Sequence, residues 1–186
     1  MRFLTNPSTD PWYNMSFDEY CLEQYSSDDS FFYLWRNAPS VIIGLNQNAF
    51  AEVNLGYLEE RGIRLARRVT GGGAVYHDLQ NLNYTFIGRE VTPEPMVAAL
   101  RSLGVPAELT GRNDIYVGGR KVSGYARRGG RGREIIHGTL MYDVDLEPLA
   151  RALSVPGSKF ETASGIASVH AKVANLKEFL PQFRDL

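Results

Sequence analysis

Three consecutive glycines, Gly71–Gly73, give the clearest chemical signal in the sequence. Without Cβ atoms, this backbone can adopt positive φ angles and lie directly against a ligand. Successive amide N–H groups in such a turn form a concave donor surface that suits phosphate oxygens, and the preceding Arg67 and Arg68 add charge-assisted donors. The segment predicts an anion-binding loop, while a tight hairpin with surface arginines would explain the same residues.

A second segment places Lys121 and Ser123 two positions apart on a predicted strand, so their side chains should share one face. Gly124 and Ala126 follow and leave room for a ligand beside the ammonium, which suits a phosphoryl or carboxylate group. An exposed cation on a hairpin is the alternative. His137 lies on the strand after an arginine-rich segment, and it is either a structural residue or a neighbour of the same cleft.

The elements that must position these residues alternate between helix and strand. The pattern predicts a mixed α/β domain of the α+β type, with a largely antiparallel sheet and flanking helices. Segment 127–133 has no apolar residue, and we expect a mobile, solvated loop there. We expect helices at 11–25, 55–61, 96–103, 146–153 and 176–180, and strands at 31–36, 41–44, 63–68, 74–76, 83–87, 105–109, 114–117, 120–126, 135–144 and 166–173, with 31–36 and 41–44 joined as a hairpin.

Composition restricts the class of protein. The 186 residues, 44% of them hydrophobic, suffice for one domain with a substantial core. Twenty basic and 21 acidic residues leave a net charge of −1, which argues against bulk nucleic-acid binding. The apolar runs are too short to cross a bilayer, and no secretory segment is evident. With a single cysteine, Cys21, these features indicate a cytoplasmic protein without a membrane partner.

Six segments occur in one order along the chain: RRVTGGGAVYHD (67–78), NLNYTF (81–86), GRND (111–114), RKVSG (120–124), HGTL (137–140) and GIASV (165–169). In order and spacing they resemble lipoate–protein ligases, and the resemblance covers nearly the whole chain. It implies a biotin/lipoyl ligase-like catalytic domain, of the class II synthetase type, that spans residues 1–186 as a single unit. Their joint occurrence favours a ligand-binding glycine loop and a functional Lys121 over the structural alternatives.

The resemblance implies a two-step acyl transfer. The carboxylate of lipoate attacks the α-phosphorus of ATP, which carries Mg²⁺, and gives lipoyl-AMP and pyrophosphate. The amine of an acceptor lysine then attacks the acyl carbon and releases AMP. The implied acceptors are the lipoyl domains of 2-oxoacid dehydrogenase E2 subunits and the glycine-cleavage H protein.

The same resemblance assigns roles to individual residues. Lys121 would touch both the lipoate carboxyl group and the phosphate, and Asp114 could help to hold a Mg²⁺–phosphate assembly. The arginine-rich segment 127–133 would close over the adenylate and exclude water. The apolar dithiolane tail needs a tunnel, with Trp35, Val41, Ile43, Val75 and Tyr76 as candidate lining residues. The residues implied to bind ATP or lipoyl-AMP are Arg68, Gly71, Gly72, Gly73, Ala74, Val75, Tyr76, His77, Asn81, Asp114, Lys121, Ser123, Gly124, Ala126 and His137.

The sequence also departs from the family pattern. Gln80 stands where glycine is usual, and segment 168–173 lacks the usual arginines. Ligases of this type usually continue into an accessory domain, which we expect to be absent here. Either the sequence is a piece of a longer protein, or ATP-dependent activation relies on a separate partner chain. Three alternatives stay open: a lipoyl or octanoyl transferase with Cys21 as a thioester nucleophile, a biotin–protein ligase-like enzyme, and a non-catalytic binding module.

Overall fold

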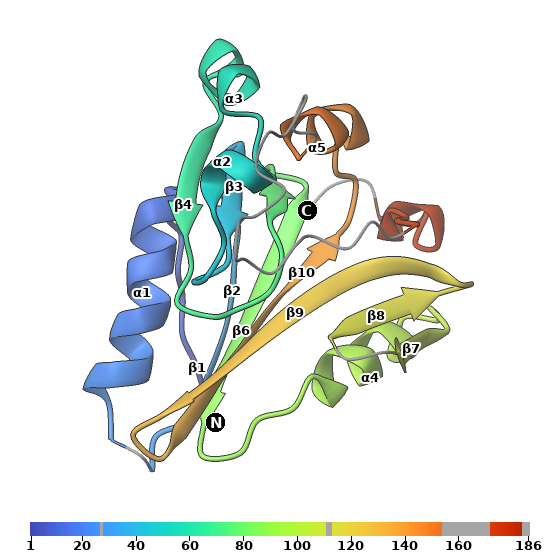
Figure 1. Cartoon of the computed structure of the whole chain (residues 1–186). Coiled ribbons are helices and arrows are strands. Elements are labelled where there is room, and N and C mark those ends of the chain that lie inside the picture. The colour runs from blue at the N-terminus through green and yellow to red at the C-terminus, as the bar shows by residue number, and fades with distance from the viewer. Residues whose placement is uncertain (27, 111–112, 154–171, 184–186) are drawn as a thin grey trace.

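The computed structural model describes residues 1–26, 28–110, 113–153 and 172–183 (Figure 1). Its helices are α1 (Pro11–Gln24), α2 (Ala49–Glu52), α3 (Leu55–Arg61), α4 (Glu94–Ser102), α5 (Leu146–Ala152) and the 3₁₀ helix η1 (Leu176–Glu178). Its strands are β1 (Arg2–Phe3), β2 (Phe31–Trp35), β3 (Ser40–Ile43), β4 (Arg64–Arg67), β5 (Val75–His77), β6 (Asn81–Gly88), β7 (Ala107–Thr110), β8 (Asp114–Val117), β9 (Arg120–Gly130) and β10 (Arg133–Met141). None of the described helices combines the length and the apolar character needed to span a bilayer.

Two sheets make the framework. Seven strands lie in the order β1-β2-β6-β10-β9-β8-β7, and each neighbouring pair is antiparallel except β1 with β2. A smaller sheet has the order β4-β3-β5, with β3 parallel to β4 and antiparallel to β5. Helix α1 contacts both sheets, β4 of the small one and β6 and β10 of the large one (Figure 1). The expected mixed, largely antiparallel architecture is confirmed.

Local signals in the sequence locate several elements well. Asp10 caps α1 by accepting hydrogen bonds from the backbone amides of Trp12 and Tyr13, with Pro11 at the first helical position. Helix α3 ends at Gly62, whose φ of 62° is the left-handed conformation that glycine tolerates. The Gly118-Gly119 turn joins β8 to β9, again with positive φ at both glycines.

The expected hairpin between segments 31–36 and 41–44 is wrong. Strand β2 pairs with β1 and β6, whereas β3 pairs with β4 and β5 in the other sheet. All four residues of β3 are buried, as in a strand covered on both faces, whereas the residues of β2 alternate between buried and partly buried. The short connection after Trp35 therefore takes the chain from one sheet to the other.

The arginine-rich segment 127–133 is not a loop. It forms the end of β9, a turn at Arg131 and Gly132, and the start of β10. Arg133 is only 2% exposed, and its guanidinium donates to the backbone carbonyls of Cys21, Tyr25 and Asp29 near the end of α1. A strand is usually predicted from apolar side chains, and this segment has none. It is a strand because its backbone pairs with the neighbouring strand and because the guanidinium of Arg133 has buried carbonyl acceptors.

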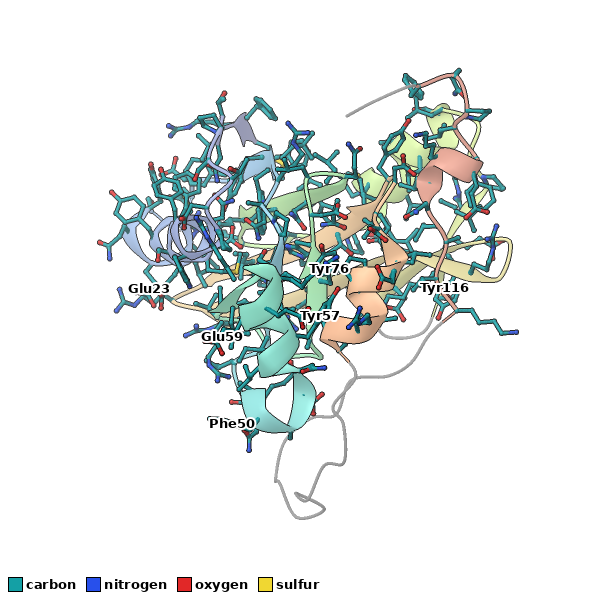
Figure 2. All side chains as sticks on the ribbon, turned by 90° about the horizontal axis from the view of Figure 1, so that it is seen from above. Glu23, Phe50, Tyr57, Glu59, Tyr76 and Tyr116 are labelled. Atoms are coloured by element: carbon teal, nitrogen blue, oxygen red, sulfur yellow. The ribbon has the colours of Figure 1, made fainter. Side chains whose placement is uncertain are left out.

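The core has clusters on both sides of the large sheet and around the small one. One of them joins the small sheet to α3 and α5, and Figure 2 shows its Tyr57 and Tyr76 between these helices, with Phe50 at the outer end of α2. Most of the expected strand 166–173 lies outside the described residues. Its last residue, Val173, forms a parallel bridge with Lys121 of β9. The expected helix 176–180 is the short η1.

Candidate active site

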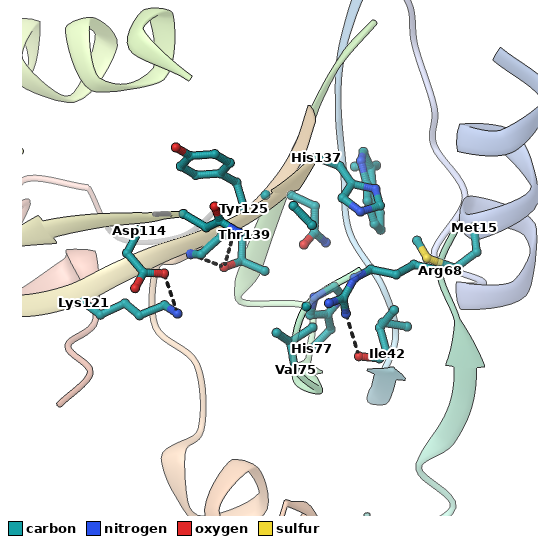
Figure 3. A pocket seen from close by; sticks show the side chains of 17 residues that line it. Met15, Ile42, Arg68, Val75, His77, Asp114, Lys121, Tyr125, His137 and Thr139 are labelled. Atoms are coloured by element: carbon teal, nitrogen blue, oxygen red, sulfur yellow. Dashed lines mark hydrogen bonds and ion pairs between the residues drawn. The ribbon is translucent and has the colours of Figure 1, made fainter. Parts of the chain in front are cut away.

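A pocket of about 610 Å³, counting its open mouth, lies between the two sheets (Figure 3). Ten residues expected at the site line it: Trp35, Arg68, Gly72, Val75, His77, Asp114, Lys121, Gly124, Ala126 and His137. Seven lining residues were not expected: Met15, Ile42, Asn83, Asn113, Tyr125, Gly138 and Thr139. Segments separated by a hundred positions in the sequence thus meet around one volume.

Strand register explains which residues of the large sheet meet at the pocket. Trp35 of β2 lies opposite Asn83 of β6, which lies opposite Thr139 of β10. The Thr139 hydroxyl accepts from the Gly124 amide at 3.2 Å, and Gly124 lies opposite Asp114 of β8. These five residues form one row across five strands, with Trp35 and Asp114 at its two ends.

Lys121 reaches this row because β9 contains a bulge. The register with β8 shifts so that Lys121 lies opposite Tyr116, and Ser123 lies opposite Ile115. The side chain of Ser123 is fully buried and does not line the pocket. The expectation that Lys121 and Ser123 share one face is therefore wrong, since the extra residue reverses the alternation of side chains.

The Lys121 ammonium forms an ion pair with Asp114 at the mouth of the pocket (Figure 3). The Nζ and Oδ1 atoms are 2.7 Å apart, and about a quarter of each side chain is exposed. Gly124 makes this possible, because a Cβ there would lie 3.0 Å from both Cε and Nζ of the lysine. A partly exposed ammonium beside a single carboxylate can exchange that partner for a ligand anion.

The glycine loop is organised around the side chain of Arg68, which is 7% exposed. Its Nη2 donates to the carbonyls of Gly71 and Gly73 at 2.8 and 2.7 Å, and its Nη1 donates to the carbonyl of Ile42 at 3.1 Å. Burial lowers the arginine pKa to about 10, so the group remains a cation near neutral pH. Arg68 therefore holds the loop from within, besides lining the pocket.

The close approach of two backbone segments fixes the same loop. Gly72 has a φ of 95°, and its carbonyl oxygen would lie 2.2 Å from a Cβ at Gly44. Gly44 follows β3 and was not among the expected site residues. The sequence feature that could have identified Gly44 is its position directly after a buried apolar strand, where a glycine often marks a close approach of backbone.

A buried polar network lies behind the pocket and was also missed. Asp18 of α1 is 1% exposed, and its Oδ2 lies 2.6 Å from Nδ1 of His137. The other imidazole nitrogen lies 2.7 Å from the hydroxyl of Thr70, which accepts from Arg68. Asp18 lies on the buried stripe of α1 between Met15 and Leu22, and a charge inside an apolar stripe was the signal for it.

Several expected site residues lie away from the pocket. Val41, Ile43 and Tyr76 pack in the cluster around α3 and α5, so the proposed tunnel lining by these residues is corrected. Alternation along β3 turns Ile42 toward the pocket instead. Gly71, Gly73, Ala74 and Asn81 are not lining residues either. The side-chain amide of Asn81 donates to Asn83 Oδ1 at 2.8 Å, so Asn81 orients a residue that lines the pocket.

Comparison with known proteins decides the family. A model of the lipoyl protein ligase A/B catalytic domain matches residues 10–186. The chain belongs to this family. It is similar to the lipoate-protein ligase LplJ of Bacillus subtilis, with 45% identity over 190 residues, 97% of this chain and 57% of the relative. The chain thus spans a little over half the length of this curated relative.

Solved structures agree with this membership. The catalytic domain resembles lipoate-protein ligase A bound with ATP, with a TM-score of 0.79 and 30% identity over 96% of this chain and 77% of the other. It also resembles a bi-partite lipoate protein ligase from Thermoplasma acidophilum, with a TM-score of 0.79 and 32% identity over 96% of this chain and 75% of the other. The expected family and fold class are confirmed.

Within the lipoyl protein ligase domain, Cys21 is a packing residue. Its side chain is fully buried in the cluster beneath α1, and it is not among the lining residues of the pocket. Burial, followed by the nearby charge of Asp18, raises the pKa of the thiol to about 12. A thiolate nucleophile is correspondingly disfavoured, and the thioester route loses its candidate residue.

Proposed function

We propose that this domain activates lipoate with ATP to lipoyl-AMP and transfers the lipoyl group to a lysine of a lipoyl-acceptor domain. One arrangement carries the proposal: the Lys121–Asp114 ion pair and the glycine loop braced by Arg68 line the same pocket. A movable ammonium and a rigid backbone loop are the two donor types that an acyl-adenylate requires.

In the first step a carboxylate oxygen of lipoate bonds to the α-phosphorus of ATP, and the bond from that phosphorus to pyrophosphate breaks. In the second step the acceptor amine bonds to the acyl carbon, the bond to AMP breaks, and the amine gives up a proton. Negative charge grows on oxygens around both centres. Lys121 would leave Asp114 and meet the carboxyl and phosphoryl oxygens in both steps.

The residues present fit a magnesium ion only together with the nucleotide. Among the described residues, no three His, Cys, Asp or Glu side chains form a metal cluster. Asp114 supplies one carboxylate in the pocket, and Mg²⁺ commonly takes one or two carboxylates with phosphate oxygens. When bound, the ion would neutralise charge on the phosphates, and Asp114 would help to hold it.

The acceptors that we propose are the lipoyl domains of 2-oxoacid dehydrogenase E2 subunits and the glycine-cleavage H protein. The Thermoplasma relative supports this class, because its structure is described together with an E2 lipoyl domain. That relative is bi-partite, which supports the further proposal that a second chain can assist activation.

The decisive experiment follows modification of an E2 lipoyl domain by mass spectrometry, in parallel with ATP plus lipoate and with synthetic lipoyl-AMP. Modification in both reactions supports the complete ligase activity. Modification by lipoyl-AMP alone supports a transferase that needs a second chain for activation. No modification in either reaction would contradict the proposed function and favour a binding module.

Replacing Lys121 by alanine tests its assigned role. We expect transfer from lipoyl-AMP to fall by about 10²–10³-fold, the usual effect of removing one preorganised donor. The matched control is Lys172→Ala, which removes an exposed ammonium that does not line the pocket. Single-turnover rates for both variants, with circular dichroism as a folding check, measure the effect. A Lys121→Ala rate equal to that of the control would contradict the assignment.

A further inference from the structure

Two buried N–H groups in the pocket have no hydrogen-bond acceptor among the residues that the structure describes. They are Nε2 of His77 and Nδ2 of Asn83. Both residues line the pocket, and their exposed fractions are 3% and 1%. Because a buried donor without an acceptor costs free energy, unpaired donors at a pocket wall point to a ligand that accepts from them.

The donor of His77 is fixed by a chain of amides behind it. Asn14 Nδ2 donates to Asn37 Oδ1 at 2.7 Å, which turns the Asn37 amide nitrogen toward His77 Nδ1 at 3.0 Å. Nδ1 therefore accepts, and the proton of the neutral ring is on Nε2. Burial, then the charges of Arg68 and His137, lower the His77 pKa to about 3, so the ring stays neutral near pH 7.

Asn83 is oriented in the same way. Its Oδ1 accepts from Asn81 Nδ2 at 2.8 Å, which leaves its own Nδ2 as the unpaired donor. The carbonyl groups of the glycine loop do not require either donor, because the carbonyls of Gly71 and Gly73 already accept hydrogen bonds from Arg68. Both are therefore available to a ligand.

The row across the sheet sets the distance from Asn83 to Gly124, which lies beside the Lys121 side chain. Asn83 and Gly124 lie on β6 and β9, which are separated by β10. Two strand spacings amount to about 10 Å, which suits an extended medium-chain acyl group. A substrate whose carboxyl group meets Lys121 would thus place the far end of its tail near Asn83. Figure 3 shows His77, Val75, Ile42 and Met15 across the pocket from Lys121.

The lining at this far end is apolar apart from the two donors and two further polar side chains that already have partners. Arg68 donates to backbone carbonyls, and His137 lies between Asp18 and Thr70. Met15, Trp35, Ile42 and Val75 contribute carbon and sulfur surface there. Such a site matches a group that is mainly apolar and accepts hydrogen bonds weakly. A dithiolane ring has this character, because its sulfur atoms are weak acceptors within an apolar ring.

From this geometry we infer that His77 Nε2–H and Asn83 Nδ2–H recognise the dithiolane sulfurs and make the pocket prefer lipoate to octanoate. The inference rests on the proposed function. An octanoyl tail fills the same apolar space but leaves both donors unpaired. A site built to hydrogen-bond a substrate discriminates against an analogue that lacks the partner atoms.

The imidazole offers a matched pair of substitutions. His77→Gln keeps an amide N–H near the position of Nε2. His77→Asn keeps a group near Nδ1 that can pair with Asn37, but it has no donor at Nε2. Asn83→Leu removes the second donor and keeps the branching of the side chain at Cγ. None of these changes alters Lys121 or the glycine loop.

The experiment measures dissociation constants of lipoate and octanoate by calorimetry for the parent chain and the three variants. We expect the parent chain to bind lipoate more tightly. We expect the ratio of the two constants to fall about tenfold, 1.4 kcal/mol, in His77→Asn and Asn83→Leu, and to be retained in His77→Gln. Equal loss for both acids would indicate a merely structural role and overturn the inference, as would a parent chain without preference.

Failure of the proposed function gives a different result. A parent chain that binds lipoate in preference to octanoate but modifies no acceptor, even from lipoyl-AMP, contradicts the catalytic proposal and leaves the recognition intact. A chain that modifies acceptors with both acids equally well contradicts the recognition alone. Where Asn83→Leu fails to fold, the His77 pair still decides the outcome.

Discussion

Burial decides which side chains of this domain remain available for chemistry. Lys121 keeps about a quarter of its side chain exposed and has one carboxylate partner. Arg68 is a cation too, but it is nearly buried and donates to several backbone carbonyls. We therefore propose that Lys121 stabilises charge on the substrate and that Arg68 positions the glycine loop.

The buried Cys21 leads to the prediction at this scale. Cys21→Ala should leave transfer from lipoyl-AMP within about twofold of the parent rate, because the thiol lies outside the pocket and its pKa is raised to about 12. Mass spectrometry of the acceptor domain measures the rate. A covalent lipoyl adduct on Cys21, or loss of transfer in a folded variant, would restore the thioester mechanism.

At the scale of elements, the pocket depends on contacts between segments of backbone. The small sheet carries the glycine loop between β4 and β5, and Gly44 at the end of β3 lies against it. The β9–β10 hairpin forms much of the opposite wall and is tied to α1 through Arg133. Changes at these two places should affect different properties.

Gly44→Ala should displace the glycine loop. The new Cβ would lie 2.2 Å from the Gly72 carbonyl oxygen, so the loop must shift. We expect at least a tenfold rise in the KM for ATP and also in the KM for lipoyl-AMP, because the loop is proposed to bind the phosphate of both. Gly130→Ala is the control, since nothing lies within 4 Å of its Cβ. Equal kinetics in both variants would argue against a tight loop.

Arg133→Met should lower stability rather than alter the site. The change leaves three backbone carbonyls near the end of α1 without their donor, at a cost of about 1–3 kcal/mol for each buried unsatisfied group before relaxation. Arg131→Asn in the same hairpin is the control, because Arg131 is exposed and asparagine tolerates its φ of 52°. Urea unfolding of both variants measures the difference, and equal midpoints would contradict it.

The whole molecule is held together partly by buried polar networks that cross between elements. Asp18 of α1 meets Tyr33 of β2, Thr85 of β6 and His137 of β10. His77 is bound behind the pocket by Asn37. Burial disfavours the charged form of His77 and lowers its pKa, so this ring couples global stability to pH.

Acid should destabilise the domain through His77. Its folded pKa of about 3 lies below the ordinary 6.5, so the unfolded chain binds the proton first as pH falls. The free energy of unfolding should drop by up to about 1.4 kcal/mol per pH unit between those two values, with no contribution from this group above them. His77→Gln should flatten that slope in urea titrations across pH 4–8. An unchanged slope would mean that the pKa of His77 does not differ between the folded and the unfolded chain.

The sequence by itself determined the family and the features that depend on neighbouring residues. Three such features are the cap at Asp10, the helix end at Gly62 and the turn at Gly118. Each depends on backbone angles that neighbouring residues determine, and the sequence shows directly which residues are neighbours. The glycine loop and Lys121 were found in the same way, as short segments with a distinct chemistry.

Only the tertiary structure decided which side chains share the pocket. Strand register is set by contacts between distant segments, and one extra residue at a bulge turned Ser123 away and brought Gly124 beside Lys121. The sequence pattern predicts that Arg133 is solvated, yet its acceptors lie in α1 and the segment after it, more than a hundred positions away. Asn83 became visible as a donor only in the folded chain, where its Nδ2 is buried at the pocket without a hydrogen-bond partner among the described residues.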